Sequence, residues 1–284
     1  MGIIIPILVL GSLGLLFGLG LAIASKKFCV VTDPNLERIL SCLPGANCGV
    51  CGMPGCMAFA QSLIKGRVSL ASCRAMEEEA RKKAAQILGV KLEAQVKQIA
   101  VLHCGGGNKV KDRFKYNGLE DCIAADLVMR GQKECVYGCL SFGTCQRVCP
   151  FGAVSMSEEG LPVVDAEKCR ACGKCVEVCP KGLFSLIPVA GRVHPDPVNR
   201  GWVHVACSSH DIGRDTRLVC PAGCIACRKC EKACPVDAIH VIDNLAVIDY
   251  NKCTSCGECV EVCPTKCIIM TEVRSQDSSP DRRE

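Results

Sequence analysis

Clustered cysteines are the feature that most constrains how this chain can fold. The chain has 284 residues, 27 of them cysteine. The spacing C-x2-C-x2-C-x3-C-P occurs three times, and a fourth copy ending at Cys149 and Pro150 has Phe142 in place of one cysteine. Three close thiolates fit one [4Fe–4S] cube, and the fourth reaches a second cluster. The complete copies are Cys169, Cys172, Cys175, Cys179; Cys224, Cys227, Cys230, Cys234; and Cys253, Cys256, Cys259, Cys263.

Two other uses of cysteine fit this pattern less well. Paired C-x2-C elements also bind tetrahedral Zn²⁺, but zinc sites seldom need a third close cysteine followed by C-P. A disulfide framework would require an oxidising compartment. The spacing therefore favours iron–sulfur clusters over zinc and over disulfides.

The amino terminus predicts a membrane anchor, residues 1–27. Residues 2–24 carry no charge, and roughly 22 helical residues at about 1.5 Å each span the hydrocarbon core. A secretory signal is the alternative, yet no Lys or Arg precedes the segment and its apolar run is longer than such signals use. Lys26 and Lys27 follow directly, so the positive-inside rule predicts a single span with the remainder in the cytoplasm. Gly14 and Gly18 would let another membrane helix approach closely.

A first soluble module is expected over residues 28–101. A glycine-rich loop carries three cysteines and a fourth follows at a distance, which suffices for one [4Fe–4S] cube. The pattern turns helical from Ser72 to Leu88. Cys42 is interpreted as a buried residue outside the ligand set, with a ligand role left open. The expected ligands are Cys48, Cys51, Cys56 and Cys73.

The cysteine motifs form an internal repeat. Cys149 lies 85 residues before Cys234, and the same shift places Cys139, Cys145 and Cys135 on Cys224, Cys230 and Cys220. This predicts two tandem ferredoxin-like units, 133–187 and 218–272. Short apolar segments around the loops are predicted to form brief strands beside turns. The expected fold class is α+β: one transmembrane helix, a small helix-rich cluster module and two ferredoxin-like units.

Crossed ligation within the units predicts five clusters in the whole chain. In unit 2, Cys263 would join Cys224, Cys227 and Cys230, and Cys234 would join Cys253, Cys256 and Cys259. In unit 1, Cys149 would join Cys169, Cys172 and Cys175. The remaining cluster has Cys139, Cys145 and Cys179, and Cys135 is the nearest candidate for the corner that Phe142 leaves empty, with a three-iron cluster as the alternative. A sixth cluster using Cys104 and Cys122 is left open.

The remaining segments carry weaker signals. Residues 102–132 are interpreted as a connecting segment, 188–217 as a linker and 273–284 as a polar tail. No dinucleotide fingerprint or phosphate loop accompanies the glycines at 105–107, so no NAD site is expected on this chain. Nearly balanced charge over residues 133–270 disfavours nucleic acid as a partner.

Three segments together with the anchor resemble a known family. The anchor, the LPGANCGVCGMPGC run at 43–56, GCLSFGTCQRVCPFGAV at 138–154 and DYNKCTSCGECVEVCP at 249–264 are similar to the B subunits of Rnf complexes. These are membrane-bound, ion-translocating ferredoxin:NAD⁺ oxidoreductases. The resemblance implies an electron-transfer subunit of this translocase at the inner (cytoplasmic) membrane. It would accept electrons from soluble ferredoxin and pass them to membrane and peripheral subunits, with membrane lipid around its anchor.

Basic residues inside the cluster loops are candidates for meeting an acidic ferredoxin. No catalytic side chain is required, because the expected chemistry is outer-sphere electron transfer. The alternative function is a membrane polyferredoxin that serves a hydrogenase or a corrinoid iron–sulfur system. The candidate docking residues are Arg170, Lys174, Arg228, Lys229 and Lys232.

Overall fold

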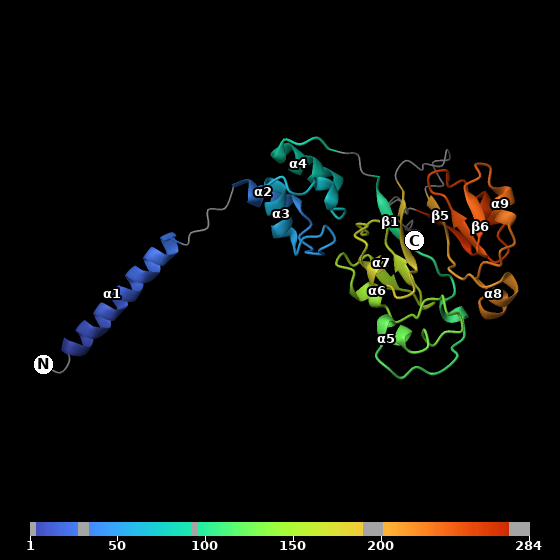
Figure 1. Ribbon diagram of the computed structural model, residues 1–284, viewed down its shortest axis with the longest axis horizontal. Helices are drawn as coiled ribbons and strands as arrows, with labels where there is room; N and C mark the ends of the chain where they lie inside the picture. The colour runs from blue at the N-terminus through green and yellow to red at the C-terminus, as the bar shows by residue number, and fades with distance from the viewer. Residues whose placement is uncertain (1–3, 28–33, 93–95, 190–200, 273–284) are drawn as a thin grey trace, which may run out of the picture.

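A computed structural model describes residues 4–27, 34–92, 96–189 and 201–272. The apolar helix α1 lies apart from the remainder, followed by a small helical module and then by two units built of short hairpins and helices (Figure 1). The expected α+β content is present. Cys29 and the polar tail lie outside the described residues, as does part of the expected linker, 190–200.

Helix α1 (Ile4–Lys27) is long and apolar enough to cross a membrane over Leu8–Lys27. Its large side chains pack against nothing else in the described chain; Leu15 and Leu21 are 70% and 71% exposed. An apolar helix with no protein partner is stable where lipid surrounds it, because its backbone hydrogen bonds are all internal. The two lysines that close it agree with the anchor that the sequence predicts.

Three helices build the first module. Helices α2 (Pro34–Cys42), α3 (Cys56–Ile64) and α4 (Glu78–Leu88) bury Ile39, Phe59 and Ala84 in one core. The helix expected from Ser72 begins only at Glu78. A 3-10 turn (η1, Leu70–Ser72) ends at Cys73, whose backbone is extended, so this cysteine can leave the helical path and point at the loop cysteines.

Each ferredoxin-like unit consists of two antiparallel strand pairs with short helices between them. In the first unit β1 (Gln98–Leu102) pairs with β4 (Phe184–Pro188), and β2 (Val154–Met156) pairs with β3 (Pro162–Val164). In the second, β5 (Gly201–Val205) pairs with β8 (Ile268–Glu272), and β6 (Ile239–Ile242) with β7 (Leu245–Ile248). The helices are α5 (Cys122–Leu127), α6 (Thr144–Arg147) and α7 (Lys174–Val178), then α8 (Gly213–Val219), α9 (Lys229–Ala233) and α10 (Glu258–Glu261), with a 3-10 turn η2 at Gly107–Lys109.

The strand pairs enlarge both units relative to the sequence expectation. Strand β1 falls within the expected first module and β5 within the expected linker, yet each closes a sheet with the last strand of a unit. Their partners lie more than 60 residues away in sequence, so short-range patterns do not reveal the pairing. Residues 102–132 and the described part of 188–217 are thus integral to the units.

Candidate metal centres

All four cysteine loops share two residues with a left-handed backbone. The residue before the second cysteine position has a positive φ in each loop, as does the residue after that position. The Phe142 loop shares both features, so it keeps the shape of a cluster-binding loop while lacking one sulfur. The paired positions are Ser141 and Gly143, Ala171 and Gly173, Ala226 and Arg228, and Ser255 and Gly257.

The second unit groups its cysteines as crossed ligation requires. Cys224, Cys227, Cys230 and Cys263 line one cavity, together with the extra thiol Cys267, whose Sγ lies 3.6 Å from that of Cys263. At the other site, burial raises the pKa of Cys259 to about 12, and negative charge on Cys253, Cys256, Cys230 and Cys234 adds to the rise. Each group contains the four cysteines inferred from the spacing, with Cys267 as a further thiol at the first site and Cys230 at the second.

The first unit repeats one of these groups closely. Burial raises the pKa of Cys175 to about 12, and the neighbouring thiols that add to the rise are Cys169, Cys172, Cys145 and Cys149. Through the repeat, these four neighbours are equivalent to the four that surround Cys259. Cys149 therefore lies with the second triplet of unit 1, as predicted.

The other group in unit 1 differs from the prediction. Cys139, Cys145 and Cys179 line a cavity whose fourth thiol is Cys122, not Cys135. Cys135 lines a different cavity, where Cys104, Cys220 and Cys207 are its neighbours. The pairing of Cys104 with Cys122 in one extra site does not fit either, because each faces a different cavity. Helix α5 carries Cys122 to a place that sequence proximity does not reveal.

The cavity with Cys135 lies at the junction of the two units, and the two units contribute to it in the same way. Cys104 follows β1 and Cys207 follows β5, while Cys135 and Cys220 are equivalent in the repeat. The amide of Cys139 donates to Cys104 Sγ at 3.4 Å, and the equivalent amide of Cys224 donates to Cys207 Sγ at 3.3 Å. A methyl group on Gly106 would approach Cys220 Sγ to 3.3 Å, so glycine backbone packs closely around these sulfurs.

The glycine-rich loop of the first module turns its cysteines toward Cys73. Burial raises the pKa of Cys73 to about 11, and negative charge on Cys51 adds to the rise, as does that on Cys48. Asn47, itself at a φ of 46°, accepts a hydrogen bond from the Cys56 amide at 2.8 Å through its side-chain oxygen. The thiol of Cys42 donates to the Arg38 carbonyl oxygen at 3.4 Å. Cys48 and Cys51 thus lie beside Cys73, and Cys56 and Cys42 both pack against the core that contains Cys73.

The spacing of these thiols suits clusters better than single ions. Within the described ranges, no three His, Cys, Asp or Glu side chains converge on one ion position. A tetrahedral zinc ion needs sulfurs about 2.3 Å from one point, and the described side chains form no such group. Amide hydrogens directed at sulfur, as from Ala153 to Cys149 at 3.3 Å and Ala238 to Cys234 at 3.2 Å, are interactions that tune cluster potentials.

The groups also follow one another through the molecule. Burial raises the pKa of Cys172, and charge on Cys48 of the first module adds to it, so these two groups are neighbours. Cys145 lies near both groups of unit 1. Cys139 borders the junction cavity as well as its own, and Cys207 lies beside Cys224. The cysteine groups form a continuous series from the first module to the end of unit 2.

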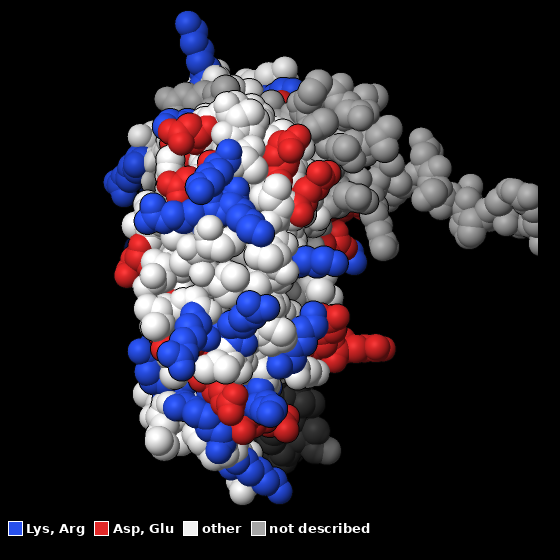
Figure 2. Space-filling view, turned by 90° about the vertical axis from the view of Figure 1, so that its right-hand side faces the viewer, with Lys and Arg blue, Asp and Glu red and all other residues white. Residues whose placement is uncertain are grey.

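The five candidate docking residues fall into two sets. Arg170 forms an ion pair with Glu77 of the first module, and Lys174 with Glu177 at 3.2 Å. Arg228, Lys229 and Lys232 are exposed on and beside α9, next to the exposed Cys227. Helix α9 lies at the end of the molecule that faces the viewer in Figure 2, where Lys and Arg side chains are spread widely.

Family models match the three cluster-bearing parts. A model for an Fe-S cluster matches residues 43–75, and models for a 4Fe-4S dicluster domain match residues 133–183 and 223–267. The chain is 45% identical to the B subunit of the Na(+)-translocating ferredoxin:NAD(+) oxidoreductase complex of Acetobacterium woodii, over 94% of this chain and 77% of the relative. The chain belongs to this family of Rnf B subunits.

Other members of the family align over similar lengths. The relative in Methanosarcina acetivorans, the B subunit of an ion-translocating oxidoreductase complex, is 41% identical over 88% of this chain and 91% of its own length. That of Clostridium ljungdahlii, from a proton-translocating ferredoxin:NAD(+) oxidoreductase complex, is 38% identical over 89% and 86%. Alignment over most of the chain means that the shared family is not inferred from the ferredoxin motifs alone.

Proposed function

We propose that this chain is the iron–sulfur electron-transfer subunit of an ion-translocating ferredoxin:NAD⁺ oxidoreductase. The observation that carries the proposal is the continuous series of cysteine groups between the exposed loops of unit 2 and the module that follows α1. The names of the relatives support the assignment to such a complex. Each [4Fe–4S] cluster, when bound, supplies a site that takes up and releases one electron.

We propose six cluster sites, one more than motif spacing alone predicts. The added site is the junction of the two units, where each unit supplies one cysteine after a strand and one before a motif. Burial raises the pKa of three of its thiols, and a bound metal centre would stabilise their thiolates. The first module would use Cys48, Cys51, Cys56 and Cys73; the junction Cys104, Cys135, Cys207 and Cys220; unit 1 Cys149, Cys169, Cys172 and Cys175; and unit 2 Cys224, Cys227, Cys230 and Cys263, with Cys234, Cys253, Cys256 and Cys259. The sixth site is the cavity with Cys139, Cys145 and Cys179.

The membrane arrangement is part of the proposal. A single span through α1, closed by Lys26 and Lys27, would leave the cysteine groups in the cytoplasm. That compartment keeps unligated thiols reduced. Membrane lipid and partner subunits would surround α1, and the first module would lie closest to them.

Soluble ferredoxin is proposed to dock at α9. The exposed cations Arg228, Lys229 and Lys232 lie beside Cys227, so an acidic partner would be brought next to a cluster ligand. Arg170 and Lys174 are less suited, because acidic side chains of this chain already pair with them.

Anaerobic iron and sulfide analysis with EPR tests the proposal. The full chain in detergent should hold about 24 iron atoms and be reduced by ferredoxin, whereas five cubes would give about 20. Cys135→Ala and Cys220→Ala should each remove the junction cluster and leave the other EPR signals in place. An iron-free chain, or one that ferredoxin does not reduce, would refute the function.

The alternative, a polyferredoxin for a hydrogenase or a corrinoid system, predicts different partners. Purification through a tag on this chain should recover flavin-bearing membrane subunits and an NAD-binding subunit if the proposal holds. Recovery of a hydrogenase or a corrinoid protein instead would support the alternative.

A further inference from the structure

The Phe142 loop has lost a sulfur and kept the two left-handed residues of its intact counterparts. It retains both left-handed residues of the intact loops, yet the Phe142 ring packs against Tyr116, with centroids 5.4 Å apart. Phe142 is absent from the lining of the cavity that Cys139, Cys145 and Cys179 share. The corner that this loop no longer fills is thus open to a thiol from elsewhere.

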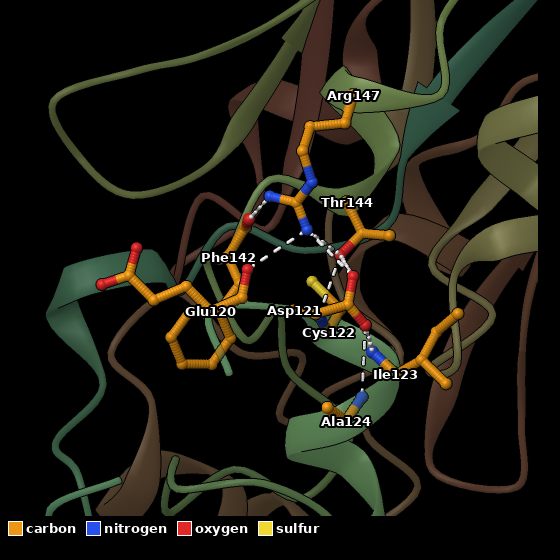
Figure 3. A network of polar contacts seen from close by, with 8 residues as sticks. All are labelled: Glu120, Asp121, Cys122, Ile123, Ala124, Phe142, Thr144 and Arg147. Atoms are coloured by element: carbon orange, nitrogen blue, oxygen red, sulfur yellow. Dashed lines mark hydrogen bonds and ion pairs between the residues drawn. The ribbon is translucent and has the colours of Figure 1, made fainter. Parts of the chain in front are cut away.

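Helix α5 brings Cys122 into that cavity, and its start is fixed to the Phe142 loop (Figure 3). The Cys122 amide donates to Thr144 Oγ1 at 2.8 Å, and the Thr144 hydroxyl donates to Asp121 Oδ2 at 2.9 Å. Asp121 Oδ1 accepts from the amides of Ile123 and Ala124 at 2.9 and 3.2 Å, which caps the helix. The cysteine is therefore held through its own amide and through the residue before it.

Arg147 links the Phe142 loop to the start of α5 through hydrogen bonds of its guanidinium group. Its guanidinium donates to the Phe142 carbonyl oxygen at 2.8 Å, to the Glu120 carbonyl oxygen at 3.1 Å and to Asp121 Oδ2 at 2.9 Å (Figure 3). A planar guanidinium can hold several acceptors at once in fixed geometry. Thr144 is buried, so its hydrogen bonds are shielded from water.

The far end of α5 is held as well. The buried Lys181 ammonium lies 2.7 Å from Asp126 Oδ1 and donates to the carbonyl oxygens of Arg130 and Val136 at 2.7 and 2.8 Å. Lys181 follows Cys179 and Pro180, so α5 is fixed at one end beside Cys145 and at the other beside Cys179.

Comparison of the two repeats shows that Thr144, Arg147 and Lys181 occur only in the unit that lacks the motif cysteine. In unit 2 the position of Phe142 is Cys227, and the positions of Thr144 and Arg147 are the exposed Lys229 and Lys232. The position of Lys181 is Thr265. The unit that has the motif cysteine lacks the anchoring residues, and the unit that lacks the cysteine has all of them.

We infer that Cys122 is the fourth thiolate of the unit 1 cluster with Cys139, Cys145 and Cys179, and that Asp121, Thr144 and Arg147 position it. This inference rests on the proposed function, because it takes the cavity to hold a [4Fe–4S] cluster. It assigns the ligand from a segment outside the motif and leaves Cys135 to the junction.

A cysteine exchange tests the assignment in the full chain. Cys122→Ala should lower the iron content by about one to four atoms and alter one EPR signal, depending on whether a three-iron cluster survives. Adding Phe142→Cys to this variant should restore both, because the loop already has the backbone of an intact motif. Cys42→Ala, which removes a half-buried thiol of the first module, is the matched control and should change neither.

The positioning residues need a separate readout. Asp121→Asn should shift the midpoint potential of that one cluster in the wild-type background and have no effect in the Cys122→Ala/Phe142→Cys background. Full iron and unchanged EPR in Cys122→Ala would overturn the ligand assignment, as would failure of Phe142→Cys to restore the signal. Equal shifts in both backgrounds would overturn the positioning role. A wild-type chain without clusters would refute the proposed function instead.

Discussion

Replacing the three exposed cations beside α9 should slow reduction by ferredoxin. Arg228, Lys229 and Lys232 make no ion pair with any described residue, so their charges are available to a partner. An exposed pair contributes about 0.2 to 1 kcal/mol, and three together about 0.6 to 3 kcal/mol. Since about 1.4 kcal/mol corresponds to tenfold, the triple alanine variant should react roughly 3 to 140 times more slowly at low salt.

Stopped-flow reduction of the clusters by an acidic ferredoxin measures this rate. The Debye length falls from about 30 Å at 0.01 M to about 8 Å at 0.15 M salt, so the difference from wild type should shrink at the higher salt concentration. Arg170→Ala/Lys174→Ala is the matched control, because Glu77 and Glu177 already neutralise those charges. Equal slowing in both variants, or a difference that salt does not reduce, would refute docking at α9.

Further predictions concern the clusters as structural elements, the extra thiol Cys267 and the helix α1. Chelating the iron under reducing conditions should abolish most far-UV circular dichroism of the strands, because β2 and β3 have three residues each and the core of unit 2 is built in part of cysteines; a persistent strand signal would contradict this. Cys267→Leu, which copies Leu183 of unit 1, should leave the iron content unchanged, and loss of iron would make Cys267 a ligand. Residues 28–284 should purify without detergent and hold as much iron as the full chain, since α1 has no buried residue among those described. Aggregation of this fragment would show that α1 covers part of the surface of the other modules.

The sequence by itself determined the features that depend on short spacing. Two-residue gaps predict three thiols in one loop, and the left-handed residues beside the second position are the local backbone that goes with them. The repeat then predicted the crossed pairs, and the structure places Cys149 beside the Cys169 triplet. An uncharged helix-length segment likewise identifies a candidate membrane span without tertiary information.

Only the tertiary structure decided where the scattered cysteines lie. Cys104 and Cys207 meet at the junction because β1 and β5 each pair with a distant strand. Cys122 reaches the Phe142 cavity because Thr144 and Arg147 hold its segment there. Spacing selected Cys135 for that cavity as the nearest free thiol in the sequence. Hydrogen bonds and strand pairing between residues far apart in the chain set these positions, and spacing along the sequence does not reveal such long-range contacts.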